Sequence, residues 1–126
     1  MSKTTLSILC VADRRNNRLT LALRGRGHSV IEAYSGDQGV AVAVGTFFDA
    51  VVLDQGLFIE TEEWSLARSF KLVRPSICIL LVSRALQVKH RRKPEGVDSI
   101  VPMNDLPEIV RTLEQLVLGT ARNWES

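Results

Sequence analysis

The sequence has few cysteines and histidines, the residues that cross-link small folds through disulfides or bind zinc. Of its 126 residues, two are cysteines and two are histidines. Cys10 and Cys78 each lie inside an apolar run, which predicts two buried thiols that behave as small hydrophobic side chains. The cysteines and histidines are also too widely spread to give a zinc-ligand spacing. A disulfide framework and a zinc module are therefore not expected.

Long hydrophobic runs are missing as well. No apolar run approaches the roughly 20 residues of a membrane span, and the first run, residues 6–11, is too short for the core of a signal peptide. We therefore expect a cytoplasmic protein without membrane contact. The net charge of +2 is too small to indicate nucleic-acid binding by itself. A chain of 126 residues predicts one domain over 1–126, with a core at about 5–118 and a tail at 119–126.

What the sequence does have is an alternation of apolar strands and amphipathic helices. Strands are expected at residues 6–11, 28–34, 49–53, 77–82 and 97–101. Five helices are expected: one after a cap at Asn16 or Asn17, one from Ser35, one from Thr61 to about Val73, a weak one at 85–93, and one after a cap at Asp105. In the second of these helices, Val40, Ala41 and Val44 are expected to face inward. This alternation predicts an α/β fold, a single (βα)5 flavodoxin-like domain. Its parallel sheet has the order 2-1-3-4-5, with helices on both faces.

Polar side chains follow three strands that are neighbours in this order. Asp13 follows the first strand, Asp54 ends the third and Ser83 ends the fourth. Ligands of open α/β sheets bind outside the carboxyl ends of the strands. Two carboxylates brought together there repel each other, and Mg²⁺, which prefers oxygen ligands, would relieve the repulsion. A nearby hydroxyl could donate to a phosphoryl oxygen, so the set suits a phosphoryl group accepted on a carboxylate.

At this point the chain resembles the receiver domain of response regulators, the CheY-like family. The resemblance rests on residues 8–13, 49–54, 81–85 and 96–102, in that order and spacing. It implies that Asp54 is the phosphoacceptor and Ser83 the switch hydroxyl. It also implies that Asp13, Asp54 and the carbonyl of Gly56 hold a weakly bound Mg²⁺.

The resemblance also implies a role and partners. The chain would be a stand-alone signalling domain in a two-component phosphorelay. Its partners would be a histidine kinase or phosphotransfer protein and a downstream protein, and a homodimer is possible. It would not be an enzyme beyond magnesium-dependent self-phosphorylation at Asp54.

Two departures from the family pattern make this a degenerate receiver. Ala12 stands where the family has the first acid of its acidic pair, and Val101 stands where it has a lysine before the proline. The main alternative is therefore a phosphorylation-independent pseudo-receiver that acts as a protein-interaction module. In that case Asp54 is a plain polar strand end, and Asp13 and Ser83 are simple helix caps.

Other classes of function find less support in the sequence. A flavodoxin-like enzyme or cofactor binder would have a glycine-rich phosphate loop after the first strand, and residues 12–15 contain no glycine. The basic run at 89–93 is interpreted as a solvated face. Binding of nucleic acid or an acidic partner through this run is the open alternative, and it would show a steep dependence on salt.

Overall fold

The computed structural model describes residues 5–13, 18–54, 60–83 and 95–125. They contain a parallel sheet with the strand order β2-β1-β3-β4-β5, which confirms the predicted 2-1-3-4-5 order. The strands are β1 (Ser7–Val11), β2 (Ser29–Ala33), β3 (Ala50–Asp54), β4 (Cys78–Ser83) and β5 (Ser99–Pro102). Each bound lies within two residues of the prediction.

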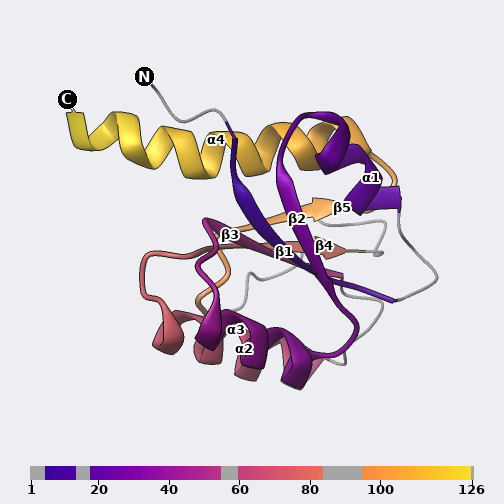
Figure 1. The fold of residues 1–126 in the computed structure, drawn as a ribbon, viewed down its shortest axis with the longest axis vertical. Helices are drawn as coiled ribbons and strands as arrows, with labels where there is room; N and C mark the ends of the chain where they lie inside the picture. Colours follow the sequence, from indigo (N-terminus) through magenta and orange to yellow (C-terminus); the bar gives the residue numbers. More distant parts are fainter. Residues whose placement is uncertain (1–4, 14–17, 55–59, 84–94, 126) are drawn as a thin grey trace.

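Helices cover both faces of the sheet (Figure 1), as predicted. They are α1 (Arg18–Gly25), α2 (Gly36–Gly45), α3 (Glu60–Val73) and α4 (Leu106–Glu125). Helices α1 and α4 pack on one face, and α2 and α3 pack on the other. Every residue of β3 is buried, because this strand is central and covered on both sides. The expected capping residues Asn16 and Asn17 and the weakly helical stretch 85–93 lie outside the described residues.

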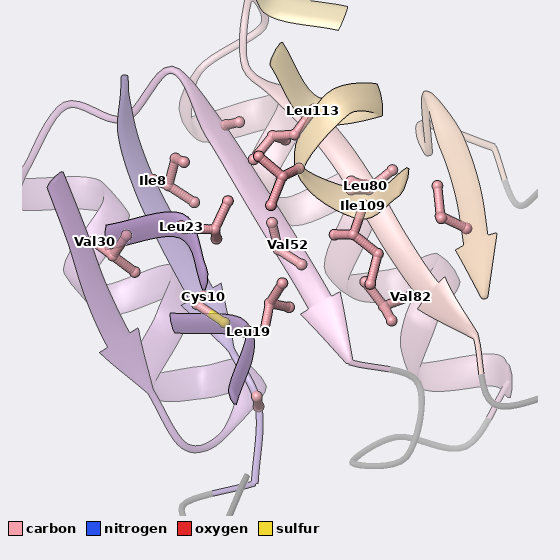
Figure 2. Close-up of a cluster of buried hydrophobic side chains, with 14 of the residues drawn as sticks. Ile8, Cys10, Leu19, Leu23, Val30, Val52, Leu80, Val82, Ile109 and Leu113 are labelled. Atoms are coloured by element: carbon pink, nitrogen blue, oxygen red, sulfur yellow. The ribbon is translucent and has the colours of Figure 1, made fainter. Parts of the chain in front are cut away.

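The core on the α1 and α4 side is built from alternate residues of the strands (Figure 2). Cys10, Val52 and Leu80 point to this side, and their neighbours Leu9, Val51 and Ile79 belong to the opposite core. Successive side chains of a strand alternate between the faces, so a strand buried on both sides must be apolar throughout. This requirement explains the continuous apolar runs of the sequence.

The inward face of α2 differs from the prediction. Gly39 and Ala43 are the buried residues of this helix, whereas Ala41 is exposed and the exposed fraction of Val44 is 68%. The prediction of Ala41 and Val44 as inward residues was therefore wrong. A Cβ atom at Gly39 would lie 3.0 Å from Val11 Cγ2. The helix thus approaches the sheet through its small side chains, a pattern that a search for large apolar residues misses.

The last helix is longer than expected. Asp105 caps it as predicted, because its carboxylate accepts the amide N–H of Glu108 at 3.1 Å. The helix then continues to Glu125, so residues 119–125 of the expected tail are helical. The glycine at 119 does not end it, although glycine is a common helix terminator. Within the described segments no helix combines the length and apolar character that a membrane span requires.

Two aspartates fix the register of strands at the amino end of the sheet. The carboxylate of Asp49, just before β3, accepts the amide N–H of Ser7 at 2.8 Å. The carboxylate of Asp98, just before β5, accepts the amide N–H of Ile79 at 2.7 Å and pairs with Lys71 Nζ at 3.1 Å. A shift by one residue would break these bonds and turn each side chain to the wrong face.

A buried histidine joins the start of β1 to α4. His28 Nδ1 accepts the amide N–H of Leu6 at 3.1 Å, so this nitrogen carries no proton. The other ring nitrogen, Nε2, therefore carries the proton, and it donates to Glu114 Oε2 at 2.7 Å. Arg26 donates to the same carboxylate. These hydrogen bonds tie β1, the end of α1 and the middle of α4 together.

Both cysteines are free, as predicted. Cys10 on β1 and Cys78 on β4 are separated by β3, about 9–10 Å for two strand spacings, which is beyond disulfide reach. Burial raises the pKa of Cys10 to about 12 and also raises the pKa of Cys78, which is only half-buried. We expect a thiol reagent at pH 8 to label Cys78 before Cys10 in the native protein, followed by peptide mass mapping. Equal labelling rates, or faster labelling of Cys10, would contradict this order.

Candidate functional site

The carboxylate predicted as phosphoacceptor ends the central strand. Asp54 is the last residue of β3 and is fully buried. The apolar run before it forms the rest of the strand. A carboxylate in this environment keeps its charge only with hydrogen bonds or opposite charge around it. Asp54 thus lies at the carboxyl edge of the sheet, where ligands of open α/β sheets bind.

Asp13 comes from the neighbouring strand. The register pairs Val11 of β1 with Leu53 of β3, so Ala12 is the next residue level with Asp54, and Asp13 follows one residue beyond. Ala12 is buried and Asp13 is partly exposed. Adjacent strands are about 4.8 Å apart. The fold therefore brings the two predicted carboxylate residues to the same edge, on neighbouring strands.

Ser83 comes from the other neighbour of β3. It is the last residue of β4, is fully buried, and follows Val82, which is paired with Asp54. Its carbonyl accepts the amide N–H of Met103 at 2.8 Å. This bond holds the end of β4 against the chain that leaves β5. Asp54 and Ser83 therefore end two adjacent strands, and Asp13 lies two residues beyond the end of the third.

The register also places Val101, the residue that stands where the family pattern has a lysine. Asp54 pairs with Val82, and Val82 pairs with Val101, so these three residues form one row across β3, β4 and β5. Val82 and Val101 both belong to the core under α1 and α4. A long side chain at position 101 would run along this row toward Asp54. The buried valine supplies packing there and no charge.

Sequence reasoning missed a polar network beside the site. Thr20 of α1 is buried, and its hydroxyl donates to Glu32 Oε2 of β2 at 3.0 Å. Burial raises the pKa of Cys10, a hydrogen bond with Thr20 lowers it, and the charges of Glu32 and Asp54 raise it further. Val52, two residues before Asp54 on β3, points to the α1 side of the sheet, and the alternation of side chains along a strand puts Asp54 on the same side. Thr20 follows the apolar Leu19 in the sequence, where nothing distinguishes it from an exposed threonine.

The side chains that could hold a metal at this edge are few. Among the described residues there is no group of three or more His, Cys, Asp or Glu side chains that could hold an ion. Asp13 and Asp54 offer carboxylate oxygens alone, which is the chemistry that Mg²⁺ prefers, and Mg²⁺ commonly binds through one or two carboxylates with phosphate and water. The residues present fit such an ion. Gly56, the predicted carbonyl ligand, and the basic run 89–93 lie outside the described residues.

Comparison with known proteins identifies the fold. No protein-family model and no curated protein matches the sequence. Among solved structures, a CheY-like receiver domain protein from Methanospirillum hungatei superposes with a TM-score of 0.77 at 16% identity, covering 95% of this chain and 99% of that one. The receiver domain of the sensor histidine kinase PA1611 from Pseudomonas aeruginosa, with a magnesium ion coordinated in its active-site cleft, gives 0.73 at 22% identity, covering 92% and 99%.

A third similar structure is the chemotaxis response regulator CheY4 of Vibrio cholerae. Its TM-score is 0.73 at 18% identity, over 90% of this chain and 99% of that one. These similarities confirm the predicted fold: the chain has the flavodoxin-like fold of response-regulator receiver domains, with five parallel strands in the order 2-1-3-4-5. At such identities the similarity concerns the fold, and the roles of individual residues are argued from the site.

Proposed function

We propose that this chain is a receiver-type signalling domain of a two-component phosphorelay. Asp54 accepts a phosphoryl group from a histidine kinase or phosphotransfer protein, and the phosphorylated domain binds a downstream protein. The observation that carries this proposal is the buried Asp54 at the carboxyl end of the central strand of a receiver fold, between β1, which precedes Asp13, and β4, which ends at Ser83. The receiver folds of known signalling proteins support it.

The reaction is a transfer between two nucleophiles. An oxygen of the Asp54 carboxylate attacks the phosphorus of a phosphohistidine, the new O–P bond forms, and the P–N bond of the donor breaks. The imidazole nitrogen leaves with the electron pair of that bond, and the product is an aspartyl phosphate. Asp54 must be ionised to attack.

The other residues hold and sense the group. Asp13, Asp54 and the Gly56 carbonyl would hold Mg²⁺, which when bound offsets the negative charge of the phosphoryl oxygens. The Ser83 hydroxyl donates a hydrogen bond to one phosphoryl oxygen. Ala12 contributes no charge, so the ion is held by fewer carboxylates and binds weakly.

The proposal predicts a phosphoryl adduct at one residue. The protein incubated with acetyl phosphate and Mg²⁺ should gain the mass of one phosphoryl group, because the leaving acetate makes this donor reactive without a kinase. Intact-mass spectrometry in acid, where aspartyl phosphate is most stable, checks it. The Asp54→Asn variant should show no adduct, and Asp13→Asn should show a strongly reduced yield.

The control is a second aspartate, which directly precedes the same strand. Asp49→Asn changes a carboxylate at the opposite end of the same strand and should leave the adduct unchanged. An unmodified wild-type protein, or an adduct that persists in Asp54→Asn, would overturn the assignment of Asp54 as phosphoacceptor.

A second candidate function is a pseudo-receiver that binds its partner without phosphate. The observation in its favour is the row Asp54, Val82 and Val101, in which an uncharged valine occupies the β5 position in register with Asp54. A charge-assisted hydrogen bond contributes about 1.5–3 kcal/mol, and this contribution to stabilising a phosphoryl group is missing. A phosphorylated wild-type protein would then change conformation little, since a ligand shifts an equilibrium only by its differential affinity for two states.

Restoring the cation separates the two candidates. In Val101→Lys the ammonium group can extend along the row toward Asp54, and we expect beryllofluoride, a phosphoryl mimic, to cause larger amide chemical-shift changes than in wild type. Val101→Met, of similar length without charge, is the control. If Val101→Lys and Val101→Met respond alike, the row does not connect position 101 with Asp54.

A further inference from the structure

Strand β2 forms one outer edge of the sheet, because β1 is its only partner among the described strands. The amide N–H of Ser29 donates to the carbonyl of Leu6 at 2.9 Å, so the backbone groups of Ser29 face β1. The backbone groups of successive residues point to opposite sides of a strand, so every second residue from position 30 onward faces away from β1. These outward residues are Val30, Glu32 and, directly after the strand, Tyr34.

An outer strand of this composition can pair with another chain. Outward N–H and C=O groups are a template for an added strand, and proteins oppose such pairing with proline, charge or a cover. Residues 28–34 contain no proline or glycine, and the β-branched Ile31 is 42% exposed. The single carboxylate of β2, Glu32, accepts the hydroxyl of Thr20 on the α1 side of the sheet and does not guard the edge. The strand therefore lacks protection of its own.

Two side chains from the helices bind the outward backbone groups. Arg24 Nη2 donates to the carbonyl of Val30 at 2.9 Å, and Gln38 Oε1 accepts the amide N–H of Tyr34 at 2.6 Å. Arg24 belongs to α1 and Gln38 to α2, which cover opposite faces of the sheet. The two side chains thus reach the edge from both faces, one at each end of the strand. We call these two hydrogen bonds the edge bonds.

We propose that Arg24 and Gln38 close the outer edge of β2 against pairing with an extended apolar segment of another chain. A strand added to this edge would need the carbonyl of Val30 and the amide N–H of Tyr34 as its own partners, so both edge bonds have to break before it can pair. The proposal does not depend on phosphorylation and is tested separately from the proposed function.

A double variant, Arg24→Ala with Gln38→Ala, tests the closure. It leaves the outward groups of Val30 and Tyr34 open, and we expect the protein to aggregate at least about tenfold faster than wild type, the effect of about 1.4 kcal/mol on an activation barrier. Thioflavin T fluorescence and light scattering of the full chain at neutral pH measure the rate. Each single variant opens one end of the edge and should give an intermediate rate, which covers the case in which the double variant does not fold.

Conservative replacements should preserve the closure. Arg24→Lys with Gln38→Glu keeps a donor at one end of the strand and an acceptor at the other, so this variant should aggregate as slowly as wild type. Arg18→Ala with Gln115→Ala removes the same two types of side chain from exposed positions on α1 and α4, and it should also behave like wild type. This matched pair controls for the loss of one positive charge.

A third comparison separates an open edge from a less stable fold. Phe70→Leu removes packing from the core under α2 and α3 and leaves both edge bonds in place. The Arg24→Ala and Gln38→Ala double variant should aggregate faster than Phe70→Leu. A double variant with the rate of wild type overturns the proposal. Equal rates in the double variant and in either the Arg18 and Gln115 pair or Phe70→Leu also overturn it, because charge or stability would then be the cause.

Discussion

Phe70→Ala should lower the free energy of unfolding by about 3–5 kcal/mol, the usual cost of removing a buried aromatic side chain. Phe70 lies on the inner side of α3 and is fully buried, and it is the largest fully buried side chain among the described residues. Its ring fills the space beneath α2: a Cβ atom added at Gly39 would lie 3.2 Å from Phe70 Cζ. Helix α2 approaches so closely that it cannot relax into the cavity without losing its own contacts.

Urea denaturation monitored by circular dichroism measures this loss. Phe70→Leu, which leaves a smaller cavity, should lose less than Phe70→Ala. Leu72→Ala changes an exposed residue of the same helix and should change stability by less than about 0.5 kcal/mol. A Phe70→Ala protein as stable as Leu72→Ala would show that α2 and α3 can close over the gap, contrary to the packing described here.

His28→Ala should be the second most damaging substitution, at about 2–4 kcal/mol. It leaves the buried amide N–H of Leu6 without its acceptor, at about 1–3 kcal/mol, and adds a cavity. It also removes the hydrogen bond that His28 Nε2 donates to Glu114, leaving the bonds from Arg26. Two conservative variants separate these losses. His28→Asn places an oxygen near the position of Nδ1 and should keep the Leu6 bond, whereas His28→Gln places an amide donor near Nε2 and should keep the Glu114 bond.

The same cluster makes part of the stability pH-dependent. The hydrogen bond from Arg26 is the largest cause that holds the pKa of Glu114 below its usual value of 4.5; burial opposes it, and the bond with His28 lowers the pKa further. A carboxyl group with a lowered pKa in the folded state stabilises the fold above the unfolded pKa and loses this effect as pH falls through the folded pKa. The stability advantage of wild type over Glu114→Gln should therefore be greatest above about pH 4.5 and fade in stronger acid. An advantage that stays constant down to pH 2 would contradict the assignment.

The sheet could be predicted from the sequence because the same pattern, a short apolar run, occurs once for each strand. Each strand is a short apolar run with a boundary residue such as Asp49 or Pro75, and right-handed crossovers leave few orders for five of them. The same logic placed Asp13, Asp54 and Ser83 at one edge, since a residue that ends a parallel strand lies at the carboxyl edge whatever the detailed packing.

What could not be predicted depends on contacts between distant elements. The inward face of α2 is chosen by the approach of Val11 and Phe70 to Gly39, which no local pattern reveals. The polar contact of Thr20 with Glu32 requires knowing that α1 crosses β2. The end of α4 was misjudged because a glycine inside a helix costs about 1 kcal/mol, a penalty that the rest of the helix outweighs.

The two aspartates at the amino end of the sheet have a consequence for how the domain can change. Asp49 holds β1 and Asp98 holds β4 in register at the end of the sheet opposite the candidate site. The alignment of these strands therefore does not depend on the identity of Ala12, Asp13 or Ser83. Because the two sets of residues are separate, single substitutions can add or remove reactive side chains at the carboxyl edge while the sheet keeps its geometry. Substitutions at the candidate site and an intact fold are compatible in this chain, because the site and the bonds that hold the register lie at opposite ends of the same strands.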